Sequence, residues 1–216
     1  MTLTSLAIAR RTLLLAACSL ALTACGGGGS SSSGGGTPGM PAPVPAVTLT
    51  VTHKIRITTN KGVIDLGLDA THAPTTVANF LKYVNDGFYK DTIFHRVISN
   101  FVIQGGGVVR TANGLVEKTA TYAPIVLESN TGLRNVRGTI AMARTNIANS
   151  ATSQFYINVV DNASLNYPGA DNGGGYAVFG MVTAGLDVVD AIKGVQTGAN
   201  DVPVADVVIT DVKVLP

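Results

Sequence analysis

Tryptophan is absent from this sequence of 216 residues, and aromatic residues make up only 6% of it. The aromatic residues are not interleaved with lysine and arginine, so there is little support for a surface on which nucleic-acid bases stack. Charged residues are also scarce, at 13%, and the formal net charge of +2 is cancelled if Arg10 and Arg11 are removed with an N-terminal signal. A neutral chain argues against nucleic acid as a partner.

Cysteine is nearly absent as well. The chain has two cysteines, Cys18 and Cys25, and both precede the region 49–216 that we expect to fold. The folded region therefore has neither a disulfide nor a thiolate metal site, and it must be stable through its core alone.

Motifs for cofactors and activated nucleophiles are missing too. His53, His72 and His95 are scattered without metal-ligand spacing, and there is no GxSxG elbow, no GxxxxGK phosphate loop and no dinucleotide fingerprint. The GGG runs at 105–107 and 173–175 are expected to mark tight turns and close backbone approaches. We therefore expect no metal and no cofactor, and we interpret His95 as a structural residue.

The first 24 residues have the organisation of a secretory signal peptide, with a basic pair, the apolar run Leu13–Leu22 and then small residues. The apolar run is too short for a comfortable membrane span. The sequence LTAC, which ends at Cys25, resembles a bacterial lipobox, the motif at which the chain is cut before a cysteine that is then lipidated. The alternative is an ordinary signal cut after LTA, which would leave Cys25 a free thiol.

A lipidated Cys25 makes the lipid bilayer an expected partner. Because Gly26 and not aspartate follows it, we expect the chain in the cell envelope, on the periplasmic face of the outer membrane. Residues 25–48 would form the lipidated cysteine and a flexible tether rich in Gly, Ser and Pro. The remainder, 49–216, is long enough for one domain with a sizeable core.

The domain is expected to contain many short strands and two helices. Alternating patterns on either side of a turn predict a hairpin from 53–59 and 62–68. Apolar residues at helical spacing predict one helix from Pro74 to Gly87, and a shorter one over 185–194. Further strands are expected at 92–98, 101–104, 137–144, 153–160, 176–182 and 206–216. This inventory predicts an antiparallel barrel or sandwich with capping helices.

One apolar stretch, FHRVISNFVIQGGG at 94–107, carries polar groups that a buried strand would not place there without partners. Strand alternation puts Phe94 and Arg96 on one face, and Val102 and Gln104 on one face of the next segment. We therefore expect the guanidinium and the amide to meet at the edge of an apolar patch that contains Phe101.

The segments FHRVISNFVIQGG, GTIAMAR, NSATSQFYINV and YAVFG, in this order and spacing, resemble the signature of the cyclophilins. The resemblance covers 52–216 and is greatest to bacterial periplasmic members. It implies a mainly β fold, a closed eight-stranded antiparallel β-barrel capped by two α-helices. It also implies peptidyl-prolyl cis-trans isomerisation of proline-containing polypeptides without cofactor or metal.

The resemblance assigns roles to individual residues. Arg96, Phe101 and Gln104 would be catalytic. The substrate would bind along Val102, Ala143, Arg144, Gln154, Tyr156, Leu165 and Tyr176. Arg96 suits the reaction because a permanently charged, rigid donor can be aimed at the prolyl nitrogen when the peptide bond is twisted.

Three positions depart from the common pattern of the family. Many members have Met at Val102 and Phe at Tyr156, so the expected pocket is slightly larger and gains a hydroxyl that must face water or find a partner. Ser164 stands where many members have Trp or Phe. Because that Trp supports cyclosporin binding, we expect weak sensitivity to the drug.

Three functions remain open from the sequence. The first is a lipid-anchored, monomeric prolyl isomerase that assists the folding of exported proteins. The alternative is a chaperone or adaptor that binds proline-containing segments with little turnover, and a third possibility is a structural lipoprotein whose barrel is only a scaffold. Three acidic side chains are expected to be plain solvated surface: Asp65, Asp69 and Glu117.

Overall fold

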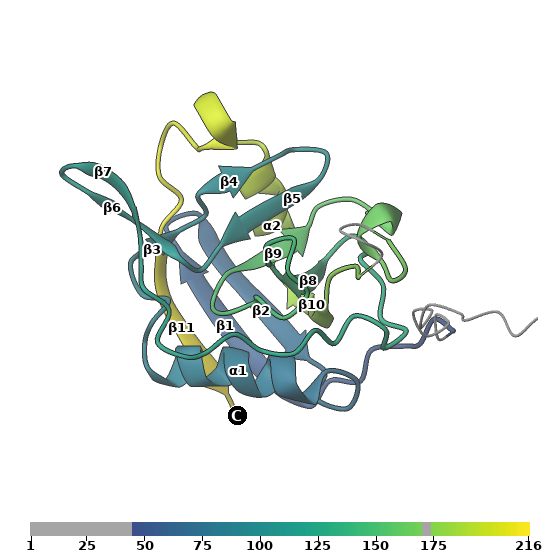
Figure 1. The fold of residues 1–216 in the computed structure, drawn as a ribbon. Helices are drawn as coiled ribbons and strands as arrows, with labels where there is room; N and C mark the ends of the chain where they lie inside the picture. The colour runs from purple at the N-terminus through teal and green to yellow at the C-terminus, as the bar shows by residue number, and fades with distance from the viewer. Residues whose placement is uncertain (1–44, 170–173) are drawn as a thin grey trace, which may run out of the picture. The chain divides into compact units, whose positions relative to one another are not determined.

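The computed structural model describes residues 45–169 and 174–216, coloured in Figure 1. The expected signal peptide, Cys25 and the tether up to residue 44 lie outside this part of the chain. Within it, no helix has the length and apolar character needed to cross a bilayer. No cluster of three or more potential metal ligands occurs among the same residues.

The main body is an eight-stranded antiparallel sheet that curls strongly on itself (Figure 1). In spatial order its strands are β11 (Ile209–Leu215), β1 (His53–Thr59), β2 (Gly62–Leu68), β10 (Val178–Ala184), β8 (Thr139–Met142), β9 (Phe155–Asn158), β5 (Val102–Gly105) and β4 (Arg96–Val97). The mainly β fold expected from the sequence is confirmed.

The expectation of a closed barrel is wrong, because β4 and β11 are the two edges of the sheet and do not pair with each other. The segment that precedes β4 and the segment that precedes β11 do contact each other. They share one isolated bridge, between Ile93 and Val208, and a hydrogen bond from the Phe94 amide to the Val207 carbonyl. Since β4 is only two residues long, it cannot support a ladder that would close the curl.

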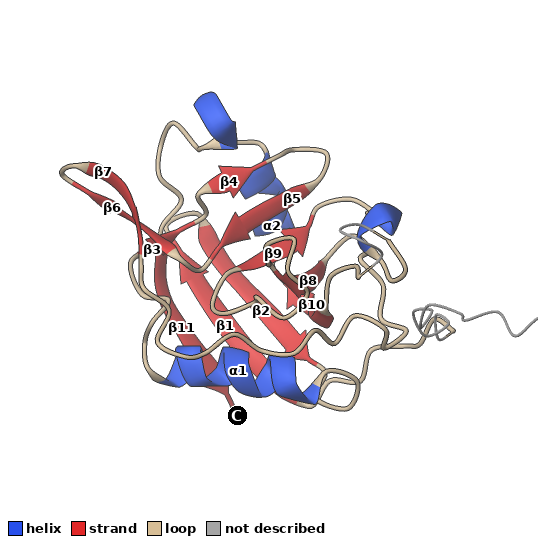
Figure 2. Ribbon diagram, in the orientation of Figure 1, coloured by secondary structure: helices blue, strands red, loops and turns tan. Residues whose placement is uncertain are grey.

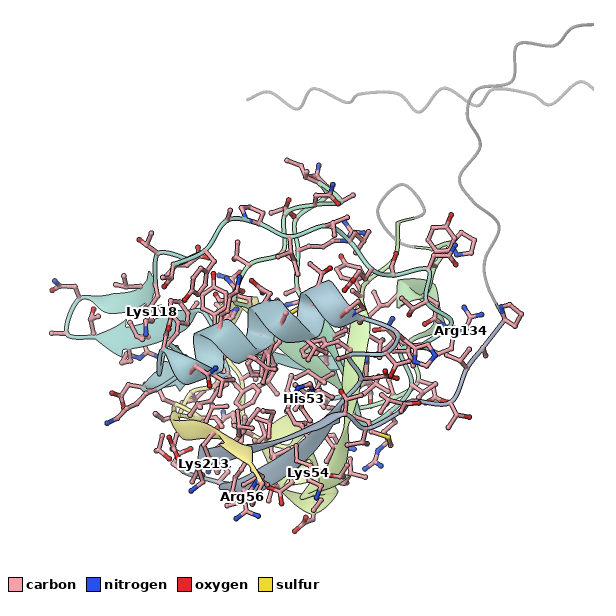
Figure 3. The ribbon with its side chains drawn as sticks, turned by 90° about the horizontal axis from the view of Figure 1, so that it is seen from below. His53, Lys54, Arg56, Lys118, Arg134 and Lys213 are labelled. Carbon is pink, nitrogen blue, oxygen red and sulfur yellow. The ribbon has the colours of Figure 1, made fainter. Side chains whose placement is uncertain are left out.

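The expected hairpin of β1 and β2 is present in full, with Thr59 opposite Gly62. On its outer face Arg56 donates two hydrogen bonds of 2.8 Å to Asp65, directly across the pair. Lys213 lies opposite Arg56 on the other side, and Figure 3 shows both together with Lys54 at one edge of the molecule. This face is therefore solvated and rich in charge.

Both expected helices are found, separated from one another by the strands (Figure 2). They are α1 (Pro74–Asn85) and α2 (Leu186–Lys193). The side chain that caps α1 comes from far along the chain: the Glu128 carboxylate accepts hydrogen bonds from the amides of Thr75 and Thr76 and from the Thr76 hydroxyl. These amides have no partner within the helix, and the negative charge also suits its N-terminal dipole.

The core fills the inside of the curl, where aromatic rings pack edge to face or tilted against one another. Phe80 of α1 lies 5.7 Å from Phe155 of β9 and 5.2 Å from Phe179 of β10, measured between ring centroids. Phe94 is fully buried in this core, and not beside Arg96 as expected. The alternation fails because residues 94–95 are not in a strand, so the chain changes direction before β4 begins.

A second sheet was not expected. It contains β3 (Thr92–Ile93), β6 (Val108–Thr111) and β7 (Gly114–Glu117), and the hairpin of β6 and β7 projects from the body (Figure 1). Two short 3-10 helices, η1 (Ala163–Leu165) and η2 (Ala199–Asp201), complete the structure.

Asp69 is buried and not solvated surface as expected. Its carboxylate closes the turn between β2 and α1, accepting hydrogen bonds from the Thr71 and His72 amides, a local pattern typical of aspartate. It also accepts from the Thr50 amide and contacts His72 Nδ1 at 2.7 Å. Burial alone would raise the pKa of this carboxyl, but the hydrogen bonds from Thr50 and His72 outweigh burial and lower it.

Candidate active site

A cavity of about 140 Å³ opens on the outer face of the curled sheet. Every residue that the sequence assigned to catalysis or substrate binding lines it, except Gln154. The lining consists of Arg96, Phe101, Val102, Gln104, Ala143, Arg144, Tyr156, Leu165 and Tyr176. Residues from three strands, from η1 and from loops far apart in the sequence thus meet at one point.

Strand register explains why three of these side chains are neighbours. Arg96 of β4 lies opposite Gln104 of β5, and Gln104 lies opposite Tyr156 of β9. Residues directly opposite one another point to the same face of a sheet, a few ångströms apart. The residues next to them in sequence, Val97, Ile103 and Ile157 among others, point inward to the core.

The floor of the cavity is a second apolar cluster, separate from the main core. Val102, Tyr156 and Leu165 are buried in it, and Phe101 packs against it partly exposed. The turn that carries Phe101 is fixed by its backbone, because its carbonyl accepts hydrogen bonds from the Val159 amide and from Asn162 Nδ2. The floor can therefore hold a small apolar ring in one place.

Arg96 stands at the edge of this floor with 40% of its side chain exposed. Its guanidinium carbon lies 6.0 Å from the Phe101 ring centroid. Its Nε lies 3.5 Å from Asp201 Oδ2 at the end of η2, where Asn200 and Asp201 both have positive φ angles. Asn and Asp adopt that backbone conformation more readily than most residues. Asp201 was missed because no local pattern links it to Arg96.

The hydroxyl that Tyr156 adds has a buried partner. It donates a hydrogen bond of 2.8 Å to Asn135 Oδ1, and burial raises the pKa of the phenol. Asn135 Nδ2 in turn donates to the Leu165 carbonyl at 3.1 Å. Asn135, which carried no signal in the sequence, thus joins two residues of the cavity floor from below.

The opposite wall is held by Arg144. Its guanidinium donates to the carbonyls of Gly175 and Thr145 and stacks 4.5 Å above the Tyr176 ring. The Tyr176 ring meets the Tyr156 ring edge to face, with 5.9 Å between centroids. This places Tyr176 at the rim, as expected, and gives the Arg144 side chain a role in holding it there.

Gln154 lies outside the cavity, in a neighbouring one of about 190 Å³ that it shares with Gln104, Glu117, Ala143 and Arg144. Gln104 Nε2 donates to Gln154 Oε1 at 3.0 Å, and Gln154 Nε2 donates to Glu117 Oε1 at 2.7 Å. Glu117 is exposed, as expected for surface, but it is tied to the site through this chain of hydrogen bonds.

Among the described residues that line the first cavity, none is a Ser, Cys, His, Asp or Glu. The lining therefore offers apolar contacts and N–H donors, without a carboxylate, thiol or imidazole to take up a proton or attack a carbonyl. Such a site suits a reaction in which a bond is rotated and none is broken. His95 does not belong to the lining.

Comparison with known proteins gives one consistent family. Residues 54–214 match the family described as cyclophilin type peptidyl-prolyl cis-trans isomerase/CLD. Peptidyl-prolyl cis-trans isomerase cyp18 of Streptomyces antibioticus is 54% identical over 166 residues, which cover 74% of this chain and 98% of that protein. Peptidyl-prolyl cis-trans isomerase B of Escherichia coli K12 is 53% identical over 161 residues, 72% of this chain and 96% of that protein.

Solved structures agree with this result. A crystal structure of a Cryptosporidium parvum cyclophilin type peptidyl-prolyl cis-trans isomerase superposes with a TM-score of 0.64 at 26% identity, covering 76% of this chain and 98% of that one. A structure of the same protein in the presence of the dipeptide Ala-Pro superposes with a TM-score of 0.63, also at 26% identity, over 76% of this chain and 99% of that one.

Proposed function

The chain belongs to the cyclophilin-type peptidyl-prolyl cis-trans isomerases and has their activity, and from this premise we propose that Arg96, Phe101 and Gln104 carry the reaction. The observation that supports this assignment is the cavity itself, in which these three residues meet an apolar floor. The proline ring of the substrate occupies that floor, between Phe101, Val102, Tyr156 and Leu165.

The barrier to be lowered is about 18–20 kcal/mol and comes from amide resonance. Twisting the bond breaks this resonance and leaves a lone pair on the prolyl nitrogen. A donor that reaches this nitrogen binds the twisted state more tightly than either planar state, which is what acceleration requires. Arg96 is that donor, because it stands at the edge of the floor with its charge permanently present.

Arg96 cannot account for the whole effect. A hydrogen bond to a charged group contributes about 1.5–3 kcal/mol, which corresponds to roughly 10- to 100-fold in rate. The remainder comes from holding the ring still while the preceding carbonyl swings. Gln104 binds the substrate backbone, and Ala143 and Arg144 border the groove for the preceding residue. Gln154 acts through Gln104 and not on the proline, since it lies outside the cavity.

The assignment is tested with a protease-coupled assay of an Xaa-Pro peptide. The Arg96→Ala variant is expected to lose about 10- to 100-fold in kcat/KM, because the donor to the prolyl nitrogen is gone. Asp211→Asn, which removes a charge from the exposed outer face of β11, serves as the control and should keep wild-type activity. Equal rates in Arg96→Ala and the wild type would contradict the assignment.

We also propose that this isomerase is monomeric, lipid-anchored through Cys25, and assists folding of exported proteins at the periplasmic face of the outer membrane. The support is the signal-like segment, the LTAC sequence and the Gly/Ser/Pro-rich tether before the domain. Metabolic labelling with a radioactive fatty acid should be lost in Cys25→Ala. Labelling that persists in this variant would contradict the anchor but leave the isomerase assignment intact.

A further inference from the structure

A carboxylate and two amides form a directed chain along the edge of the active site. Glu117 Oε1 accepts a hydrogen bond of 2.7 Å from Gln154 Nε2, and Gln154 Oε1 accepts one of 3.0 Å from Gln104 Nε2. Glu117 stands at the end of β7, Gln154 just before β9, and Gln104 within β5. Three separate parts of the fold thus meet in one line of side chains.

The carboxylate fixes the direction of this chain. An ionised carboxylate can only accept hydrogen bonds, whereas an amide side chain has one donating and one accepting end. Gln154 must therefore turn its amino group to Glu117 and its oxygen to Gln104. Gln104 must then turn its amino group to Gln154, which leaves its own oxygen, Oε1, as the group available on the side of the cavity.

That direction matters to Arg96, which lies directly opposite Gln104 in the register of β4 and β5. A guanidinium has only donors, so it is compatible with an amide oxygen and not with an amide NH₂ group. Hydrogen bonds in a chain also polarise one another, so the negative charge at one end strengthens the acceptor at the other. A reversed Gln104 would present two donors to the guanidinium instead.

A glycine in the backbone leaves space for this line of hydrogen-bonded side chains. A Cβ at Gly107 would lie 2.5 Å from Gln154 Cγ, so only glycine lets Gln154 cross this point toward Glu117. The Lys118 amide donates to the Gly107 carbonyl at 2.8 Å and holds β7 in place. The Lys118 ammonium is engaged with the Phe88 carbonyl and stacks 4.3 Å above its ring.

We propose that Glu117 is a positioning residue of the isomerase, which acts through Gln154 to hold the Gln104 oxygen toward Arg96. The inference rests on the proposed function, because it assumes that Arg96 and Gln104 carry the reaction. Glu117 does not line the proline cavity but lines the neighbouring one, so it acts through other side chains. Its effect is expected chiefly on kcat, where the guanidinium acts, with a smaller change in KM because Gln104 also binds the substrate backbone.

The primary test is Glu117→Gln in the mature protein, assayed with an Xaa-Pro peptide. The substitution keeps the size of the side chain but lets it donate or accept, so both orientations of the two glutamines become populated. We expect kcat to fall about three- to tenfold, the equivalent of one ordinary hydrogen bond, with a smaller change in KM. Asp211→Asn, the same loss of charge on the outer face of β11, should leave kcat unchanged.

A double-mutant cycle separates a positioning role from a merely structural one. If Glu117 acts through Gln154, adding Glu117→Gln to a Gln154→Ala background has no further effect on kcat. The side-chain NH₂ resonances of Gln104 should also shift in Glu117→Gln and stay in place in Asp211→Asn. Gly107→Ala, which displaces Gln154 without changing any charge, should lower kcat in the same direction.

The outcomes distinguish the two proposals. If Arg96→Ala shows the expected loss of turnover but Glu117→Gln matches the wild type, or if the Glu117 and Gln154 effects are additive, Glu117 has no positioning role and the proposed function stands. If Arg96→Ala has wild-type turnover, the proposed function fails, and the inference fails with it. Loss in Glu117→Gln with an unchanged Gln104 amide spectrum would also overturn the inference.

Discussion

The hydroxyl of Tyr156 donates a hydrogen bond to the side-chain oxygen of Asn135, 2.8 Å away, beneath the floor of the active-site cavity. Both side chains are buried, Tyr156 to 4% exposure and Asn135 to 1%. Asn135 Oδ1 also accepts from Asn158 Nδ2 at 3.2 Å. The hydroxyl thus points beneath the floor, and Tyr156 contributes only its ring to the cavity.

Removal of this hydroxyl in Tyr156→Phe should therefore affect stability more than activity. Asn135 keeps its bond from Asn158, so the expected cost is about 0.5–1.5 kcal/mol in the free energy of unfolding, measured with urea. Turnover of an Xaa-Pro peptide should stay close to wild type because the ring remains. A large loss of turnover with unchanged stability would show that the hydroxyl takes part in the reaction.

Replacing Glu128 with glutamine should destabilise the domain without changing the site. The charge that caps α1 is lost, while the side chain keeps its length and one accepting oxygen. Capping and dipole interactions of this kind contribute about 0.5–2 kcal/mol. The unfolding midpoint in urea should fall, whereas Asp187→Asn in the first turn of α2, with no side-chain cap bond there, should change less.

The buried carboxyl of Asp69 is expected to make the folded domain less stable in acid. Its folded-state pKa is lowered, so the unfolded chain binds more protons than the native one when pH falls below the ordinary aspartate value of about 3.9. The stabilisation is fully present above that value and is lost as pH falls toward the lowered folded pKa. Between about pH 6 and about pH 3, the free energy of unfolding in urea should decline less for Asp69→Asn than for the wild type. An equal decline would contradict this assignment.

Because Ser164 has a small side chain, we expect cyclosporin to inhibit this isomerase weakly. It is exposed on η1, next to Leu165 of the cavity, and its small side chain offers little surface where many cyclophilins have an aromatic ring. Ser164→Trp is expected to increase sensitivity to the drug with little effect on turnover. Inhibition of the wild type by sub-micromolar cyclosporin would contradict the prediction.

The sequence predicted those parts of the fold in which one face is buried. The β1–β2 hairpin and α1 have clear periodicity because their inner residues, such as Ile57 and Phe80, enter the core. The β6–β7 hairpin was missed because none of its residues is fully buried, and Asn113-Gly114 at its turn was its one local signal. The prediction of a closed barrel was wrong because a sequence motif does not show whether the two edge strands are long enough to pair with each other.

The residues of the site were predicted from a motif, but the side chains that hold them in place were not predicted. Arg96, Phe101 and Gln104 lie within one short stretch, whereas the side chains that hold the site come from distant loops. Asn135 and Asp201 have no local pattern that points to the cavity. Two of the three glycines at 105–107 have a structural reason: Gly106 has φ +84°, and Gly107 leaves space for Gln154.

In the proposed mechanism, Arg96 stabilises the twisted peptide bond and does not merely bind the substrate. Exchange NMR of an Xaa-Pro peptide measures both quantities, the affinity and the rate of cis-trans exchange on the enzyme. We predict that Arg96→Ala lowers the bound-state exchange rate about 10- to 100-fold and leaves the affinity for the peptide nearly unchanged. A bound-state exchange rate equal to that of the wild type, or a loss confined to affinity, would contradict the account.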